Sequence, residues 1–257
     1  MERFRVERLE GIEPYGLIPW IKVENMKLDK RKKYIMVLDV ETTNNDMTSK
    51  FNDGLVYDIG FGIYDLKGKA YCERSYCIKE IFEDKSLMNS AYYREKLPIY
   101  YKELEQGKRE IKTILEVRKI VKQAIEYFNI KEVYAYNANF DFTTLNNSVR
   151  YITSSFVRWF LPYKTNVYCI WNIACQVLGT QKTFQFENVR NEKGNLKTSA
   201  ERMFAYISQN EDFEEEHIGI SDVRIEKEIL IRCLKSHKKI DKKINRACWR
   251  IPQKALA

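Results

Sequence analysis

Histidine is scarce in this sequence, and cysteine occurs only as isolated residues. The chain has two histidines and six cysteines, and no two cysteines form a Cys-x-x-Cys pair. Structural zinc sites need closely spaced cysteine and histidine ligands, and disulfide-rich folds need a dense cysteine framework. The sequence therefore gives no support to either, and we expect free, structural thiols.

Long apolar runs are also absent. No uninterrupted apolar stretch approaches the ~18 residues that a membrane helix needs. The first residues, MERFRVERLEG, alternate charged and apolar side chains and lack the apolar core of a secretory signal. There is no internal repeat or low-complexity segment. We therefore expect a cytoplasmic protein with no membrane partner.

Charge is distributed unevenly along the 257 residues. The net charge is +8: residues 235–257 carry +7, residues 1–33 carry +3, and residues 34–234 carry the remaining −2. A slightly acidic body with a basic C-terminal tail is typical of a protein that meets polyanions through its extensions and holds cations inside. A solvated, charge-rich tail without a partner is the alternative.

Strand-like runs open the central part of the sequence. Residues 34–40 (YIMVLDV) are almost wholly apolar, which predicts a central strand covered on both faces. Residues 55–66 and 69–79, joined by the Lys67-Gly68 turn, predict adjacent antiparallel strands. A further strand is predicted at 132–136.

Helical periodicity dominates the rest of the chain. Apolar residues at helical spacing predict an amphipathic helix over 113–128. This order of elements predicts an α/β protein with a mixed β-sheet flanked by helices, the order also found in ribonuclease-H-like architectures. Residues 86–110 are expected to form short helices or an inserted flap. Further helices are expected over 140–156 and 167–178, after a capping-box pattern at 198–201, and from Asp222 onwards.

Two acidic residues end the first strand. Asp39 and Glu41 are two residues apart, so their side chains project from the same face. Neighbouring carboxylates on a buried strand repel each other and lose hydration unless cations bridge them, which favours hard divalent metals such as Mg²⁺ or Mn²⁺. Such a pair alone is a weak sign of a site, because acidic residues are common in this chain.

Two more aspartates fall where helices begin. Asp141 follows the strand at 132–136 by a short Asn-rich turn, and an acid there also complements the helix dipole without any further role. Parallel strands present their carboxyl ends to one crevice, so Asp39 and Asp141 are expected close together. Asp222, in the first turn of a later helix, would complete a metal site with them.

His217 lies five residues before Asp222, in the segment HIGISD. A loop histidine at this place can reach the same crevice and remove a proton from an attacking water, because its pKa lies near neutrality. The alternative is a surface histidine that offsets the charge of the three glutamates before it.

Three motifs, in this order, resemble those of the DEDDh family of 3′→5′ exonucleases, the DnaQ-like enzymes with a ribonuclease-H-like fold. They are LDVETT (38–43), YNANFD (136–141) and HIGISD (217–222). The His-x4-Asp spacing is similar to that of the histidine branch of the DEDD superfamily. The sequence around the second and third motifs most resembles that of members from phages and Gram-positive bacteria. One departure is Tyr136, where a histidine is common in the family.

The resemblance implies a role for each motif residue. Asp39, Glu41, Asp141 and Asp222 would hold two divalent metal ions, Mg²⁺ or Mn²⁺, and His217 would be the general base. The 3′-terminal nucleotide would meet four other motif residues: Val40, Thr42, Thr43 and Asn137.

The resemblance also implies a function and a domain plan. It predicts hydrolysis of single-stranded DNA from the 3′ end with release of nucleoside 5′-monophosphates, and a DNA polymerase or replication complex as a partner. Residues 34–235 would form the exonuclease domain, with a possible inserted flap at 80–112, an N-terminal extension at 1–33 and a basic C-terminal tail at 236–257.

Two alternatives remain open at this point. One keeps the chemistry but takes RNA or short oligoribonucleotides as the substrate. The other is a non-catalytic subunit that binds nucleic acid or a polymerase. Tyrosines in the 86–110 segment are candidates for stacking on unpaired bases, although packing is the more common role; these are Tyr92, Tyr93, Tyr100 and Tyr101.

Overall fold

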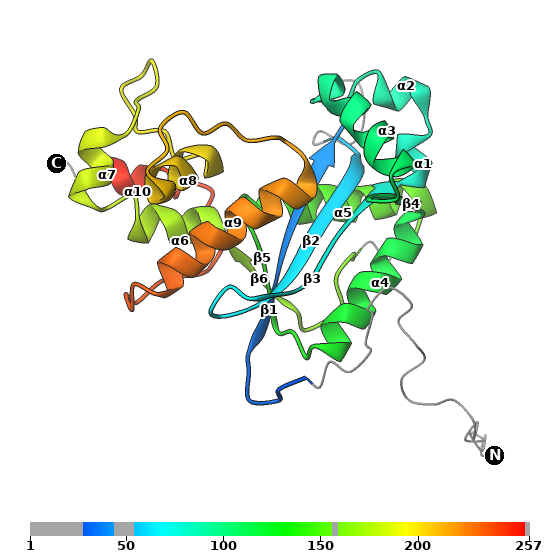
Figure 1. The fold of residues 1–257 in the computed structure, drawn as a ribbon, viewed down its shortest axis with the longest axis horizontal. Helices are drawn as coiled ribbons and strands as arrows, with labels where there is room; N and C mark the ends of the chain where they lie inside the picture. The colour runs from blue at the N-terminus through cyan, green and yellow to red at the C-terminus, as the bar shows by residue number, and fades with distance from the viewer. Residues whose placement is uncertain (1–27, 44–53, 156–158, 255–257) are drawn as a thin grey trace.

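A six-stranded mixed sheet forms the centre of the computed structural model, which describes residues 28–43, 54–155 and 159–254 (Figure 1). The spatial order of the strands is β4-β3-β2-β1-β5-β6. β2 is antiparallel to both of its neighbours, whereas β5 is parallel to β1 and β6, and β4 is parallel to β3. The strands are β1 (Tyr34–Thr42), β2 (Val56–Asp65), β3 (Ala70–Ile78), β4 (Glu110–Lys112), β5 (Glu132–Ala135) and β6 (Asn166–Cys169).

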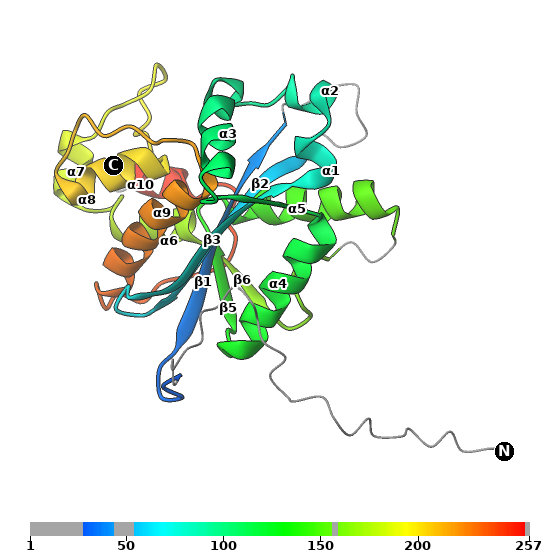
Figure 2. The same ribbon diagram turned by 45° about the vertical axis from the view of Figure 1, so that its right-hand side comes forward.

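Helices connect and cover these strands. The short helices before β4 lie at the end of the sheet where β1 finishes (Figure 2). The helices are α1 (Lys79–Phe82), α2 (Lys85–Met88), the 3₁₀ helix η1 (Arg94–Lys96), α3 (Leu97–Glu105), α4 (Ile114–Tyr127), α5 (Ala138–Thr153), α6 (Ile170–Val177), α7 (Lys182–Glu187), α8 (Ala200–Ser208), α9 (Gly219–Leu234) and α10 (Arg250–Lys254).

The sequence located the main elements and missed some short ones. The predictions of the three opening strands, of α4 and of β5 are confirmed. β2 pairs antiparallel with β1 and with β3, as predicted for adjacent strands. The prediction of a helix over 167–178 is wrong for its first turn, because residues 166–169 form strand β6, which pairs with β5. The cap of α8 is Ser199 rather than Thr198, since Ser199 accepts a hydrogen bond from the Arg202 amide.

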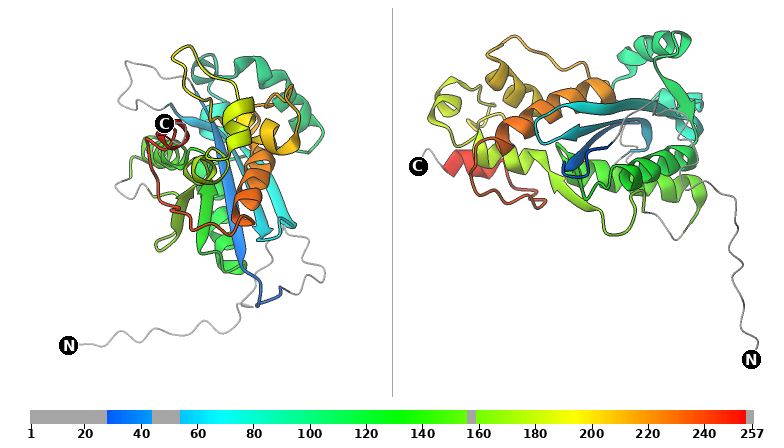
Figure 3. Two further views of the ribbon diagram at one scale, coloured as in Figure 1. Left: turned by 90° about the vertical axis from the view of Figure 1, so that its left-hand side faces the viewer. Right: turned by 60° about the horizontal axis from the view of Figure 1, so that its bottom comes forward.

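Alternation along β1 decides which side chains reach the functional face. Met36, Leu38 and Val40 belong to the hydrophobic core that also contains residues of α4 and α5. Ile35 and Val37 belong to the opposite core, with residues of α6 and α9. The sheet thus lies between two layers of helices (Figure 3). Because successive side chains of a strand point to opposite faces, Asp39 and Glu41 follow Ile35 and Val37 to the α9 side.

Two glycines bring the start of α9 against the sheet. A Cβ on Gly60 of β2 would lie 2.4 Å from the carbonyl carbon of Gly219, and a Cβ on Gly219 would lie 3.0 Å from the Gly60 nitrogen. A side chain at either position would push the helix away, because backbone atoms cannot give way as flexible side chains do. Gly219 is therefore a packing residue at the first position of α9, rather than a flexible connection before it.

The basic C-terminal segment, residues 236–254, packs on the same body. The Asn172 side chain of α6 donates hydrogen bonds to the Asp241 and Lys243 carbonyl oxygens at 2.8 and 2.9 Å. Lys242 Nζ donates to the Tyr134 hydroxyl at 2.8 Å. Cys248 is fully buried. This part of the predicted tail is therefore fixed against α6 and the sheet.

No helix in the described residues is long and apolar enough to cross a membrane. All six cysteines are free and buried, as expected. Of the predicted N-terminal extension, residues 1–27 lie outside the described residues.

Candidate active site

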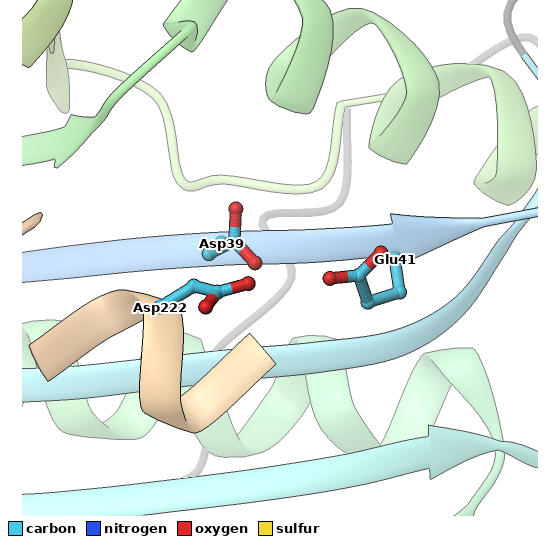
Figure 4. A group of neighbouring side chains, drawn as sticks. All are labelled: Asp39, Glu41 and Asp222. Carbon is cyan, nitrogen blue, oxygen red and sulfur yellow. The ribbon is translucent and has the colours of Figure 1, made fainter. Parts of the chain in front are cut away.

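Three carboxylates converge where β1 meets α9. Asp39 and Glu41 extend from β1, and Asp222 extends from the first turn of α9 toward them (Figure 4). One oxygen of each carboxylate lies within 4.8 Å of the others. Glu41 and Asp222 are buried, and Asp39 is partly buried. Asp39 and Glu41, predicted to share one face of the strand, thus lie beside Asp222, which is distant in the sequence.

Asp141 lies in the same pocket but is not one of the three carboxylates whose oxygens are within 4.8 Å of one another. It lies in the first turn of α5, directly after the carboxyl end of β5, and is 3% exposed. Its own backbone amide and that of Val40 lower the pKa of its carboxyl, but burial outweighs them and raises that pKa to about 8. Asp141 lines the same pocket as the three clustered carboxylates.

The cluster is electrostatically frustrated. Burial, and then repulsion from Glu226, raise the pKa of Asp39 well above its ordinary value. Burial and repulsion from Asp222 do the same for the pKa of Glu41. Burial, and then Glu215, raise the pKa of Asp222 to about 8. Crowded buried carboxylates of this kind remain ionised together only when cations compensate them.

The donor set fits a hard divalent cation. Mg²⁺ and Ca²⁺ sites are built from oxygen ligands, and carboxylates are the strongest of these in proteins. Asp39 Oδ2 and Asp222 Oδ1 are buried without a hydrogen-bond partner, so each has a lone pair that nothing in the described residues uses. These residues are suited to hold Mg²⁺ or Mn²⁺, with Glu41 and Asp141 beside them.

His217 lines the same pocket as these carboxylates, and its side chain is 32% exposed. Its backbone is left-handed, with φ of 54°. Burial, and then Lys96, lower the pKa of its imidazole, which keeps the ring neutral at physiological pH. A neutral imidazole can accept a proton, as a general base must.

The pocket has a volume of about 440 Å³. The four positions predicted to meet a nucleotide all line it: Val40, Thr42, Thr43 and Asn137. Thr43 is committed in part to the fold, since its hydroxyl accepts a hydrogen bond from the Leu55 amide at 2.9 Å. Asn137 precedes α5 without capping it through its side chain and is exposed toward solvent.

Two further carboxylates in the pocket were missed from the sequence. Glu226 is 3% exposed, its Oε2 has no hydrogen-bond partner, and burial and Asp141 raise its pKa well above the ordinary value. It lies four residues after Asp222 and so on the same helix face, a spacing that could have revealed it. Glu215 also lines the pocket, where burial and then Glu201 raise its pKa to about 7.

The tyrosines proposed to stack on bases have different environments. Tyr92 and Tyr93 line the pocket. Tyr100 is fully buried and donates a hydrogen bond to Asp58 Oδ2, so the prediction is wrong for this residue. Tyr101 is half exposed but packs on Phe82 of α1, away from the pocket lining.

A buried ion pair supports the start of α9. Asp58 of β2 pairs with Arg109, and both side chains are at most 1% exposed. Asp58 also accepts hydrogen bonds from Ser75 and Tyr100, both at 3.0 Å. Its Oδ2 lies 3.3 Å from the Gly219 amide, the first residue of α9. The pair thus connects the segment before β4 to the helix that carries Asp222.

No family model and no curated protein matches this chain. Solved structures do. A 3′-exonuclease that recognises the 3′ end of the histone mRNA stem-loop aligns over 83% of this chain and 87% of its own, with a TM-score of 0.57 and 11% identity. The nuclease domain of 3′hExo, a DEDDh family member bound to rAMP, aligns over 84% of this chain and 100% of its own, with a TM-score of 0.52 and 13% identity.

The fold is similar to that of these two exonuclease structures. The predicted class, a ribonuclease-H-like mixed sheet flanked by helices, is thereby confirmed. At such low identity the two proteins share the fold alone with this chain.

The raised pKa values of Asp141 and Asp222, both about 8, make the stability of the metal-free protein depend on pH. An unfolded chain releases these protons near pH 3.9, so the folded, metal-free protein binds more protons between pH 4 and pH 8. Their contribution to stability is fully present below about pH 4 and is lost as the pH rises toward 8. In EDTA, the melting temperature should fall between pH 5 and pH 8, as differential scanning fluorimetry would measure.

Divalent cations should reverse this loss. A divalent cation such as Mn²⁺, bound to these carboxylates in the folded state, would compete with protons for them, so it should raise the melting temperature more at pH 8 than at pH 5. Asp222→Asn should flatten the pH dependence in EDTA. A melting temperature that rises from pH 5 to pH 8 in EDTA would contradict this account of the carboxylate cluster.

Proposed function

We propose that this protein is a metal-dependent 3′→5′ exonuclease that hydrolyses the phosphodiester bonds of single-stranded DNA and releases nucleoside 5′-monophosphates. The observation that carries the proposal is the convergence of Asp39, Glu41 and Asp222 within 4.8 Å, in a pocket that Asp141 and His217 also line. A scaffold has no physical need for buried carboxylates that repel one another. Residues 34–235 are the proposed exonuclease domain.

The residues divide the work of hydrolysis. Asp39, Glu41, Asp141 and Asp222 would hold two divalent cations, which when bound supply charge neutralisation for the phosphoryl group and a more acidic attacking water. His217 would accept the proton of the attacking water, because its neutral ring lines the pocket and is one-third exposed. The 3′-terminal nucleotide lies against Thr42 and the Val40 backbone.

A basic group of the C-terminal segment lies against the helix that carries Asp141. Arg246 donates to Asn139 Oδ1 at 2.9 Å. Asn139 lies in the first turn of α5, two residues from Asp141, although it does not line the pocket. The positive segment is thus attached to α5, where it would attract a phosphodiester backbone. The same segment is the proposed contact for a polymerase or replication complex.

The test is incubation of 5′-labelled and 3′-labelled single strands of DNA and RNA with Mg²⁺ or Mn²⁺, and with EDTA. We expect the 5′-labelled DNA to shorten stepwise and the 3′-labelled DNA to release labelled mononucleotide at once, both only with metal. Faster shortening of RNA would favour an exoribonuclease instead. Binding without any metal-dependent cleavage would identify a non-catalytic subunit and overturn the proposal.

A further inference from the structure

The imidazole of His217 is stacked on the ring of Tyr93. The ring centroids are 4.0 Å apart and the planes are inclined by 7°. The two residues are far apart in the sequence, and Tyr93 comes from the segment between β3 and β4. A close parallel arrangement of this kind disfavours large tilts of the imidazole, because ring atoms would then approach one another closer than van der Waals contact.

Tyr93 is itself held against the end of β1. Ala91 forms an antiparallel bridge with Thr43, and the Tyr92 amide donates to the Thr42 carbonyl oxygen at 3.3 Å. The ring of Tyr92 packs edge-on against that of Tyr93, with centroids 4.8 Å apart. The tyrosine that contacts His217 is therefore tied to the strand that carries Asp39 and Glu41.

The orientation of the His217 imidazole depends on contacts with other segments of the chain. It follows an irregular segment that begins after α8, it is the last residue but one before α9, and its side chain is one-third exposed. On its edge, the Nδ1 atom lies 4.0 Å from Glu215 Oε2, which is longer than a hydrogen bond. Glu215 therefore does not fix the edge of the imidazole by a hydrogen bond, whereas the face of the ring lies parallel on Tyr93.

We propose that Tyr93 is a positioning residue that fixes the imidazole plane of His217 relative to the carboxylates of β1. This inference rests on the proposed nuclease function, in which His217 removes a proton from the attacking water. A general base must lie within hydrogen-bond reach of the proton that it abstracts, so loss of ring orientation reduces the rate of the chemical step. An aromatic face over the ring also favours the cationic imidazolium that the proton transfer produces.

The stacking can be measured without any substrate. The chain has only two histidines, and the other, His237, is exposed. Protons above an aromatic face are shielded, so the His217 ring protons should resonate upfield of those of His237, with His237→Gln used to assign the two signals. Tyr93→Ala should remove the upfield shift, and Tyr93→Phe should retain it.

Kinetics then test the consequence of stacking. Tyr93→Ala should lower kcat on a single-stranded substrate by roughly 10²-fold, the order expected for a misplaced catalytic group, with a much smaller change in KM. Tyr93→Phe should stay near the wild-type value, because it keeps the ring face. Tyr163→Ala, which removes a 92% exposed tyrosine outside the pocket lining, is the matched control and should leave both the kinetics and the His217 signal unchanged.

The outcomes separate this inference from the proposed function. If wild-type protein does not hydrolyse any strand with Mn²⁺, the proposed function fails. If the wild type is active and Tyr93→Ala keeps its kcat, or changes only KM, the positioning role is overturned. An unshifted His217 signal in the wild type would overturn it as well. Should Tyr93→Ala melt below the assay temperature, Tyr93→Leu retains apolar bulk without a ring face and gives the same test.

Discussion

Replacing Asp39 by asparagine is expected to lower kcat by roughly 10³-fold. A cation that neutralises the phosphoryl group contributes several kcal/mol to the transition state, and each ~1.4 kcal/mol corresponds to a factor of ten. Asp39 belongs to the carboxylate cluster, since one of its oxygens lies within 4.8 Å of a carboxylate oxygen of Glu41 and of Asp222. An amide keeps the shape of the side chain but loses the negative charge, so cation binding weakens without a change in packing.

Thermal melting distinguishes this loss of chemistry from a loss of fold. Asp39→Asn should melt at a higher temperature than the wild type in EDTA near pH 7, because burial, and then Glu226, raise the pKa of the Asp39 carboxyl, and an amide avoids the cost of protonating that carboxyl or burying its charge. It should also lose most of the gain that Mn²⁺ gives the wild type. Asp84→Asn is the matched control: Asp84 caps α2 outside the pocket, where asparagine caps equally well, so its kcat should be unchanged. Wild-type activity in Asp39→Asn would remove this residue from the site.

The sequence predicted those parts of the site that depend on local periodicity. The apolar run of β1 fixes a buried strand, and its period of two places Asp39 and Glu41 on one face. Asp141 and Asp222 follow from their positions in the first turns of α5 and α9. The two edge strands, β4 and β6, were missed: β4 has only three residues, and β6 runs directly into α6, so that the apolar pattern over 167–178 predicted a single helix.

Contacts between distant segments could not be predicted in this way. Nothing in the sequence near Tyr93 indicates that its ring lies on His217, since the two are brought together by the packing of separate elements. The pairing of Asp58 with Arg109 is of the same kind: a strand aspartate and an arginine 51 positions later meet only in the folded state. Periodicity reports which face of an element is buried, whereas the partner on that face depends on the whole fold.

The Asp58–Arg109 pair gives the largest expected effect on stability. Arg109→Met should lower the free energy of unfolding by about 3–5 kcal/mol, because it leaves the buried Asp58 carboxylate without its cation. Urea unfolding with linear extrapolation measures the change. The same substitution should lower nuclease activity, since Asp58 Oδ2 lies 3.3 Å from the Gly219 amide at the start of the helix that carries Asp222.

A second substitution shows whether the uncompensated charge is the cause. Asp58→Asn combined with Arg109→Met should be more stable than Arg109→Met alone, because the double variant has no buried carboxylate to compensate at this position. Lys122→Ala is the control for removal of a cation: Lys122 and Glu126 are 3.8 Å apart, and both side chains are more than half exposed. Its effect should stay within about 0.5 kcal/mol, as for other exposed pairs one helical turn apart. If Arg109→Met and Lys122→Ala change stability equally, the buried pair does not support the start of α9, and the position of Asp222 depends on the contact between Gly60 and Gly219 instead.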